Sequence, residues 1–325
     1  LSGGGARAYA HIGALKALRE AGTPIDFIGG ASMGAVIAAG PALGWSDEEL
    51  EHHIRQAFVL ADPLADIAPP IIAMTHARKV KALMKEAFGD VQMEDMLLPF
   101  FAVSTNLTSG KLEVHREGML RHALRASISL PGVMPPVVMN GQVLVDGAVL
   151  RNFPSDVMRR LNRGPVVGVD VSQSRGVDPK ALEDPPSWWR WILSGAWKRG
   201  PPIVSILMRS ATLSSEAERM QARAETDLLI LPTLDGVDIR DWKAYEPGVS
   251  AGYEAARAAL DSLNGSVETL HRRRRTGAPE ETVEEMAEVS FPQDVVETPR
   301  PTPEPGAPGR RRGWLGLRKA RSDKA

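Results

Sequence analysis

Five consecutive residues, Gly30-Ala31-Ser32-Met33-Gly34, follow the pattern G-x-S-x-G and stand between a short apolar run and an Ala-rich stretch. Where such a pattern joins a strand to a helix, the sharp turn strains the central serine and lifts its hydroxyl clear of the sheet. A side chain at either outer position would clash, so glycine is needed there. The spacing therefore predicts Ser32 as a nucleophile, with Gly30 and Gly34 as the glycines of its turn.

A second glycine-rich site, residues 3–8 (GGGARA), stands directly before a helical pattern. Glycines at such a place let successive backbone N–H groups point into one cleft, at the positive end of the helix dipole. A loop of this kind can hold a phosphate or a developing oxyanion. Arg7 adds a cation that either meets a phosphate or pairs with a carboxylate of the protein.

A nucleophilic serine needs a base, and the sequence offers few. Asp146 follows a predicted strand and precedes a Gly-Ala pair, so its carboxylate either caps a turn or serves as a general base. The histidines that could take this role are His115, His122 and His271, but their contexts are typical of surface or packing residues. From the residues alone, both kinds of base stay open.

The first glycine-rich site also satisfies G-x-G-x-x-A, the fingerprint of a dinucleotide-binding turn, at Gly3, Gly5 and Ala8. Such a domain needs an acidic residue at the carboxyl end of its second strand to hold the ribose. Asp26 stands at the start of that strand, and Ser32 stands at its end. The order of residues therefore favours a hydrolase over a dinucleotide-binding domain.

The elements that must position these residues alternate between helix and strand. A helix is predicted over residues 9–20 from its apolar spacing, and an Asn-Gly pair at 140–141 predicts a hairpin turn. Strands are predicted at residues 27–28, 99–105, 111–114, 137–139, 142–145, 165–172 and 227–231. Residues 27–45 carry no charge, but their glycines and Pro41 favour a strand, a turn and a buried helix over a membrane span. This order predicts an α/β sheet with helices on both faces.

Four motifs in this order, LSGGGARAYAHIGALKALREAG, GASMGA, ASISLPGVMPPV and VDGAVLRNFP, resemble those of patatin-like phospholipases. The similarity is greatest to the neuropathy-target-esterase branch and its bacterial relatives, and it extends from residue 1 to about residue 264. It implies a three-layer α/β/α fold with a mainly parallel central sheet. It also implies a Ser–Asp dyad in place of a triad that contains histidine.

Carried over by motif, the resemblance assigns Ser32 as nucleophile, Asp146 as base, and the backbone of Gly3, Gly4 and Gly5 as oxyanion hole. Two departures from the family pattern are visible. Alanine stands where the family has glycine after the arginine of its first motif, and the strand expected before the glycine-rich loop is absent. The second departure predicts a truncated first strand, as in a fragment of a longer protein.

Composition excludes several other classes of function. Among 325 residues, 39 Lys and Arg balance 40 Asp and Glu, which gives no electrostatic reason to expect nucleic acid as a partner. Zero cysteines exclude a disulfide scaffold and a cysteine nucleophile. The seven histidines show no ligand spacing such as HExxH, so neither a metal nor another cofactor is expected.

The expected substrate is a phospholipid or lysophospholipid, which the resemblance places at a membrane surface. Residues 187–197 (SWWRWILSGAW) hold four of the seven Trp beside Arg190, which suits either a bilayer interface or a packed helix. Residues 265–325, with prolines and both signs of charge, are predicted to be a disordered tail after a hydrolase domain of residues 1–264. We therefore expect a cytoplasmic protein peripheral to the membrane. A general carboxylesterase, a thioesterase and an inactive lipid-sensing scaffold remain alternatives, and the oligomeric state is open.

Overall fold

The computed structural model describes residues 1–61, 66, 68, 72–161, 164–173, 218–263, 267 and 270. The Trp-rich segment at residues 187–197 lies outside these residues, as does nearly all of the predicted tail. Of the tail, Val267 and Leu270 are described, and both pack against a hydrophobic cluster that includes Ala256. The domain boundary at residue 264 stays a prediction.

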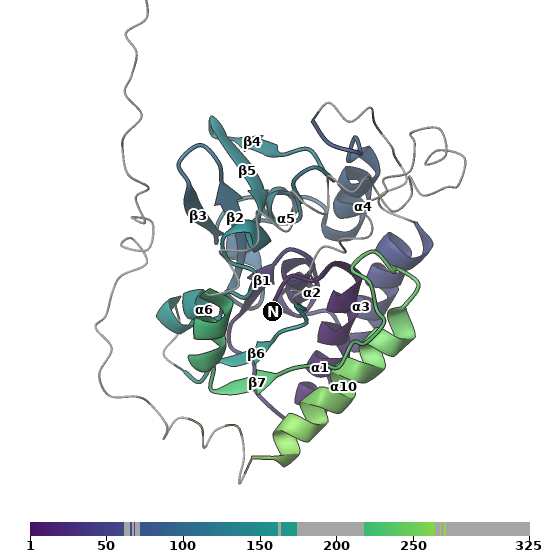
Figure 1. Ribbon diagram of the computed structural model, residues 1–325, viewed down its shortest axis with the longest axis vertical. Helices are drawn as coiled ribbons and strands as arrows, with labels where there is room; N and C mark the ends of the chain where they lie inside the picture. Colours follow the sequence, from purple (N-terminus) through teal and green to yellow (C-terminus); the bar gives the residue numbers. More distant parts are fainter. Residues whose placement is uncertain are drawn as a thin grey trace, which may run out of the picture. The chain divides into compact units, whose positions relative to one another are not determined.

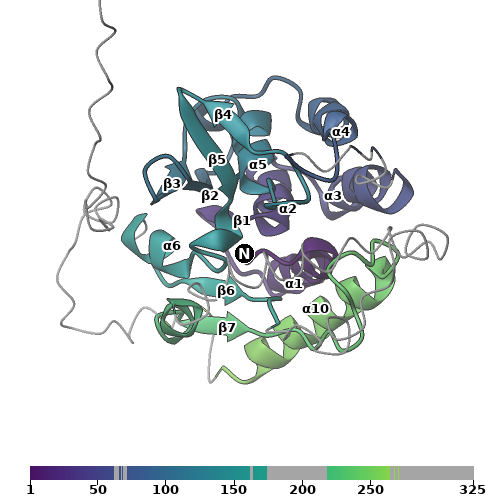
Figure 2. The ribbon, with the colours of Figure 1, turned by 45° about the horizontal axis from the view of Figure 1, so that its top comes forward.

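The described strands form two sheets, one of five strands and one of two (Figures 1 and 2). The larger sheet has the order β1-β2-β5-β4, with β3 also paired to β2, and the smaller sheet consists of β6 and β7. The strands are β1 (Ile28–Ala31), β2 (Phe100–Asn106), β3 (Lys111–His115), β4 (Val137–Met139), β5 (Gln142–Asp146), β6 (Val167–Val169) and β7 (Leu228–Ile230). Each overlaps a strand predicted from the sequence.

The α/β class is confirmed, but the expectation of a mainly parallel sheet requires correction. Of the pairings between described strands, β1–β2 and β6–β7 are parallel, whereas β2–β3, β2–β5 and β4–β5 are antiparallel. Two of the antiparallel pairings have a local cause, because tight turns join β2 to β3 and β4 to β5, and a tight turn can only join antiparallel strands. Asn140 and Gly141 form the second turn with φ of 53° and 76°, as the Asn-Gly pair predicts.

The chain's first residues join the two sheets. The amino group of Leu1 donates to Gly29 O at 2.8 Å, and the N–H of Ala31 donates to Leu1 O at 3.1 Å. On the other side, the N–H of Ser2 donates to Val169 O at 3.1 Å. Residues 1–2 therefore lie between β1 and β6, and the glycine-rich loop that follows begins at the carboxyl end of β1.

Helices cover both faces of the larger sheet. The strands alternate their side chains, so Ala102 of β2 packs in a cluster with α2, α3, α4 and α5, while Phe101 and Val103 pack with Val157 of α6. Helices α1 and α10 pack along each other next to β6 and β7 (Figures 1 and 2). The helices are α1 (Tyr9–Glu20), α2 (Met33–Leu43), α3 (Asp47–Ile54), α4 (Arg78–Phe88), α5 (Leu120–Ser127), α6 (Ser155–Leu161) and α10 (Tyr245–Asp261).

Shorter helical segments complete these elements, and they are η1 (Gly5–Ala8), the π-helical η2 (Arg55–Leu60), η3 (Met93–Asp95) and η4 (Gly147–Val149). Helix α2 is the buried Ala-rich helix predicted for the uncharged run, and ten of its eleven residues are buried. Its C-terminus is fixed by Gly44 at φ 83°. Among the described residues, no helix combines the length and the apolar character needed to cross a bilayer.

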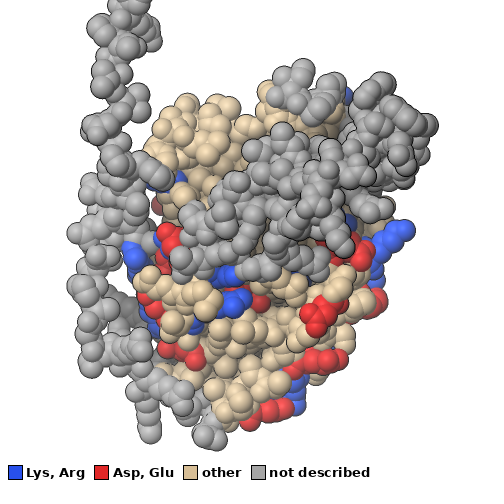
Figure 3. Space-filling model, viewed as in Figure 1, with Lys and Arg blue, Asp and Glu red and all other residues tan. Residues whose placement is uncertain are grey.

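Acidic and basic side chains are interspersed on the described surface of the face seen in Figure 3. Ion pairs join Arg19 to Asp47 and Arg55 to Glu246, with partly exposed side chains. Exposed pairs of this kind contribute about 0–1 kcal/mol each. The two signs of charge are therefore mixed on the described part of this face.

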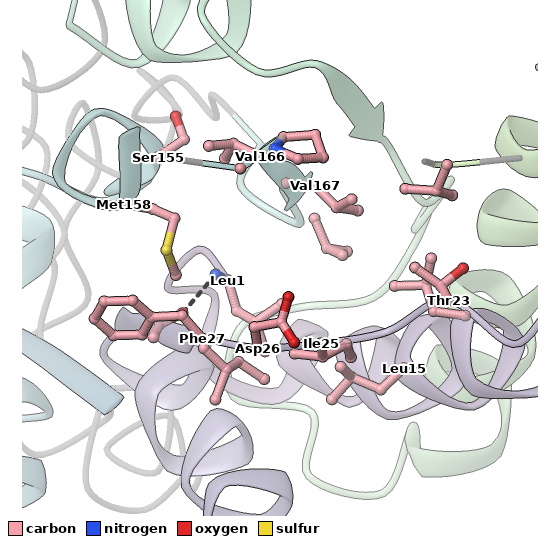
Figure 4. A pocket seen from close by; sticks show the side chains of 18 of the residues that line it. Leu1, Leu15, Thr23, Ile25, Asp26, Phe27, Ser155, Met158, Val166 and Val167 are labelled. Atoms are coloured by element: carbon pink, nitrogen blue, oxygen red, sulfur yellow. Dashed lines mark hydrogen bonds between the residues drawn. The ribbon is translucent and has the colours of Figure 1, made fainter. Parts of the chain in front are cut away.

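A cavity of about 280 Å³ lies at the amino-terminal ends of β1 and β6, beside Leu1. Figure 4 shows Leu1 with its hydrogen bond toward β1, and Phe27, Ile25 and Met158 around the same space. Most of the lining is apolar, and neither Ser32 nor Asp146 belongs to it. The cavity therefore lies at the amino-terminal ends of the strands, whereas the predicted nucleophile Ser32 follows the carboxyl end of β1. The cavity is separate from the candidate site.

Candidate active site

Ser32 lies in the turn between β1 and α2, as the G-x-S-x-G pattern predicts. Its backbone has φ of 51° and ψ of −132°, a left-handed conformation that costs a non-glycine residue free energy. The surroundings hold it there, because its N–H donates to Ser127 Oγ at 2.9 Å and its carbonyl accepts from the N–H of Ala35 and Val36. The hydroxyl thus stands at the N-terminus of α2, where the helix dipole favours negative charge.

The two outer glycines of the pattern are needed because the chain's first residues pass close by. A Cβ added to Gly30 would lie 2.7 Å from Leu1 O, and one added to Gly34 would lie 2.3 Å from Ser2 O. Real Cβ atoms do not approach backbone oxygen so closely. The tight turn therefore allows the segment that enters the glycine-rich loop to run directly past the serine.

The hydroxyl of Ser32 donates to Asp146 Oδ2 at 2.7 Å. Strand register explains this meeting of residues that are 114 positions apart. Ala31 of β1 pairs with Val103 of β2, and the next residue of β2, Ser104, pairs with Asp146 at the end of β5. Ser32 is 9% exposed and Asp146 is 1% exposed, so the pair is nearly excluded from water.

Burial changes the acidity of Asp146. Loss of hydration raises the pKa of its carboxyl to about 7, although hydrogen bonds from the Ala148 N–H and the Ser32 hydroxyl act in the opposite direction. The bond from Ala148 N–H reaches Oδ1 at 2.8 Å and leaves Oδ2 to Ser32. A carboxylate with a pKa near neutrality is a far better proton acceptor than an ordinary aspartate. This pair can therefore move a proton from the serine.

The glycine-rich loop offers two free backbone donors beside this pair. The N–H of Gly3 is already used, since it donates to Asn152 O at 3.0 Å, and the N–H of Ala6 donates to Ile239 O at 2.8 Å. Between them, the N–H groups of Gly4 and Gly5 have no acceptor among the described residues. Of the three glycines predicted to form an oxyanion hole, Gly4 and Gly5 therefore have N–H groups without an acceptor among the described residues.

Arg7 lies directly after this loop and is buried, with 3% of its surface exposed. Its Nε donates to the carbonyl oxygen of Val237 at 2.9 Å. The side chain thus ties the start of η1 to the segment before α10. Contact with a lipid phosphate, one of its two predicted roles, stays a prediction.

The histidines considered as bases lie elsewhere. His115 is buried on β3, where its Nε2 is 2.7 Å from Ser104 Oγ, and His122 on α5 lies beside Arg121. His271 lies outside the described residues. In the described part of the chain, the group that contacts the Ser32 hydroxyl is therefore a carboxylate.

Two residues of the site gave no clear signal in the sequence. Ser127 accepts the N–H of Ser32, and Asn152 contacts Gly3 with both its backbone and its side chain. Both belong to the motifs ASISLPGVMPPV and VDGAVLRNFP. Their position inside these motifs was the available signal, but a single polar residue does not reveal a partner more than 90 positions away.

Residues 1–159 match the family model described as patatin-like phospholipase, and this range contains Ser32, Asp146 and both glycine-rich sites. The match, together with the fold, defines the class. Through these residues the chain belongs to the patatin-like phospholipase family.

Within that family it is similar to an uncharacterized NTE family protein of Mycobacterium tuberculosis, with 35% identity over 81% of this chain and 46% of the relative. Human patatin-like phospholipase domain-containing protein 6 is 31% identical over 80% of this chain and 20% of its own length. Neuropathy target esterase sws of Drosophila melanogaster is 35% identical over 81% of this chain and 19% of its own length. The chain thus spans less than half the length of these relatives. The crystal structure of VipD from Legionella pneumophila aligns with a TM-score of 0.43 and 16% identity, over 81% of this chain and 66% of that chain.

Proposed function

We propose that this protein is a serine esterase that hydrolyses acyl esters of lysophospholipids or phospholipids through an acyl-serine intermediate. The observation that carries the proposal is the 2.7 Å hydrogen bond from the Ser32 hydroxyl to Asp146, made by a serine in a strained turn at a helix N-terminus. Family membership supports the class of reaction and the lipid substrate.

Acylation begins when Ser32 Oγ attacks the ester carbonyl carbon and its proton passes to Asp146 Oδ2. The carbonyl π electrons move onto oxygen, which gives a tetrahedral oxyanion. Collapse of this intermediate breaks the bond to the alcohol oxygen, and the proton on Asp146 passes to that oxygen as the lysophospholipid or glycerophospho-alcohol leaves. The pKa of about 7 at Asp146 suits both directions of transfer at neutral pH.

The N–H groups of Gly4 and Gly5 stabilise the oxyanion. Each such donor contributes about 3–4 kcal/mol in comparable hydrolases, because it is already oriented when the charge develops. The N-terminus of α2 adds a positive dipole at the same place. Deacylation repeats the sequence with water as nucleophile and Asp146 as its base, which releases the fatty acid and restores the Ser32 hydroxyl.

A lipid ester is met at a membrane surface, so we infer that the protein acts there as a peripheral protein on the cytoplasmic side. A general carboxylesterase or thioesterase would use the same dyad but would show no preference for an aggregated lipid. The dinucleotide-binding alternative is disfavoured, because the family match covers both glycine-rich sites.

Fluorophosphonate labelling tests the proposal, because these probes phosphonylate only an activated serine. We expect the parent protein to be labelled at Ser32, as mapped by mass spectrometry of the modified peptide, and the Asp146→Asn variant to lose the label. Turnover is then measured with lysophosphatidylcholine, a p-nitrophenyl ester and an acyl thioester. Absence of label in folded parent protein would contradict the esterase, and label with faster turnover of the soluble ester or thioester would favour the alternatives.

A further inference from the structure

The peptide group between Gly3 and Gly4 is held by Asn152, which stands in the loop after Asp146. Asn152 Nδ2 donates to Gly3 O at 3.3 Å, and the N–H of Gly3 donates to Asn152 O at 3.0 Å. The amide lies so close to the loop that a Cβ on Gly3 would be 2.5 Å from Asn152 Oδ1. Asn152 therefore forms hydrogen bonds with Gly3 through both its backbone and its side chain.

These hydrogen bonds fix the direction of the N–H group of Gly4, the next residue. A trans peptide is planar, and its C=O and N–H point in opposite directions. Because the C=O of Gly3 is directed at Asn152, the N–H of Gly4 is directed away from it. Ser32 is adjacent, since a Cβ on Gly3 would lie 3.0 Å from Ser32 Cβ. The Gly4 N–H is thus aimed by a side chain, and it stands beside the serine without an acceptor among the described residues.

The N–H of Gly5, the other free donor, is oriented by a backbone hydrogen bond. The carbonyl of Gly4, in the same peptide plane as the N–H of Gly5, accepts from the N–H of Arg7 at 3.2 Å. That bond belongs to the 3-10 turn that opens η1, so it forms whenever η1 forms. Of the two donors, Gly4 alone depends on a side chain among the described residues.

Asn152 is itself held in place by the loop that carries it. The N–H groups of Leu150 and Arg151 donate to Gly147 O, and the next residue along the chain, Phe153, is 1% exposed. This loop starts at Asp146, so one short segment of residues 146–153 positions both the carboxylate and the Gly3–Gly4 peptide.

We propose that Asn152 is a positioning residue whose side-chain amide orients the Gly4 N–H toward the oxyanion formed at Ser32. The inference rests on the proposed esterase function and adds to it a specific determinant of the oxyanion hole. Without the donor at Nδ2, the Gly3–Gly4 peptide is free to rotate and the Gly4 N–H no longer points where the charge develops.

The experiment compares Asn152→Ala, Asn152→Ser and Asn152→Asp with the parent protein, and it uses Asn106→Asp as a matched control. Asn106 also donates through Nδ2, but to Gln142 Oε1 at 2.8 Å and not to the loop. For the Asn152 variants we expect kcat and the rate of fluorophosphonate labelling to fall about 10²-fold, with KM nearly unchanged, because an oxyanion donor acts in the transition state. The control should keep the parent's kcat.

A second readout separates positioning from general damage. In ¹⁵N-labelled parent protein, phosphonylation should shift the Gly4 amide resonance and leave that of Gly3 in place, and the Gly4 shift should be lost in folded Asn152→Ala. Unchanged kcat in the Asn152 variants, a change in KM alone, or failure of all three to fold while Asn106→Asp folds would overturn the inference. If the parent itself is not labelled, the esterase proposal falls and this inference with it. A labelled parent with unaffected variants overturns this inference alone.

Discussion

Two buried serines, one in the turn after β1 and one within the neighbouring strand β2, each form a 2.7 Å hydrogen bond with a titratable side chain, but their backbone surroundings differ. Ser32 donates to Asp146, and Ser104 lies against His115 Nε2. They are close together, because Ser104 is the strand partner of Asp146. By residue type alone, the serine–histidine pair looks more like a hydrolase site than the serine–aspartate pair does.

Backbone position, and not the identity of the partner, distinguishes the two serines. Ser104 lies within the regular strand β2 and is completely buried, whereas Ser32 has φ of 51° and stands at the start of α2 next to two unused N–H groups. An attacking oxygen needs an approach for the substrate and donors for the oxyanion. Ser32 has two unused N–H groups beside it and 9% of its surface exposed, whereas Ser104 is 0% exposed, so we assign the Ser104 pair to the core.

The largest expected effect tests this assignment directly. Ser32→Ala should reduce kcat/KM by about 10⁴-fold or more, because the covalent route is lost. Ser104→Ala should leave kcat/KM within about threefold and instead lower the free energy of unfolding by about 1–3 kcal/mol, because the buried His115 ring loses a hydrogen-bond partner. Steady-state kinetics and urea unfolding of both variants measure the two effects. Activity lost in Ser104→Ala at normal stability would show that the comparison is wrong.

The next effect concerns Asp146 and His115, the side chains that pair with the two serines. Asp146→Asn keeps the shape of the side chain but removes the base, so kcat/KM should fall about 10²–10⁴-fold. His115→Gln, which can still bond to Ser104, should change kcat/KM little. In the parent, kcat/KM should rise with pH and reach half its plateau near pH 7, where the carboxyl of Asp146 titrates. A profile that follows an ordinary aspartate near pH 4, or a large loss in His115→Gln, would contradict the assigned roles.

Much of the fold could be predicted from the sequence because its signals are local. Apolar spacing gave the helix at residues 9–20, and the Asn-Gly pair gave the β4–β5 turn. The family resemblance implied a mainly parallel sheet, but three of the pairings between described strands are antiparallel. Two of these follow from tight turns, whereas the antiparallel pairing of β2 with β5 depends on which distant strands meet in the folded chain.

The candidate site likewise contains residues that local patterns predict and contacts that depend on distant parts of the chain. Ser32 and the glycines of its turn follow from a five-residue pattern, and the family resemblance supplied Asp146. The use of Gly3 N–H by Asn152, and of Ser127 by the N–H of Ser32, depends on contacts between residues far apart in sequence. Such contacts are set by how the sheet and loops assemble, and the type of one polar residue does not determine them.

The last expected effect is on stability as a function of pH, and the two pairs should show it with opposite sign. Between about pH 4 and 7 folded Asp146 retains a proton that the unfolded chain has lost, because burial raises its pKa from 3.8 to about 7. Its contribution therefore makes the free energy of unfolding fall as pH rises through this window, by about 4 kcal/mol at most. For His115, burial lowers the pKa from 6.5 to about 4, so the unfolded chain binds the extra proton and stability rises with pH, by about 3 kcal/mol at most.

In the parent, the contributions of Asp146 and His115 to the pH dependence of the free energy of unfolding oppose each other. Variants that lack one of the two side chains separate these contributions. Relative to the parent, Asp146→Asn should gain stability as pH rises from 5 to 7.5, and His115→Gln should gain stability as pH falls from 7 to 5. Every other titrating group is shared, so the difference from the parent in urea unfolding at these pH values isolates each side chain. The same burial that makes Asp146 a competent base thus makes its ionised form costly to the fold, and a pH slope in Asp146→Asn equal to that of the parent would show that this cost is absent.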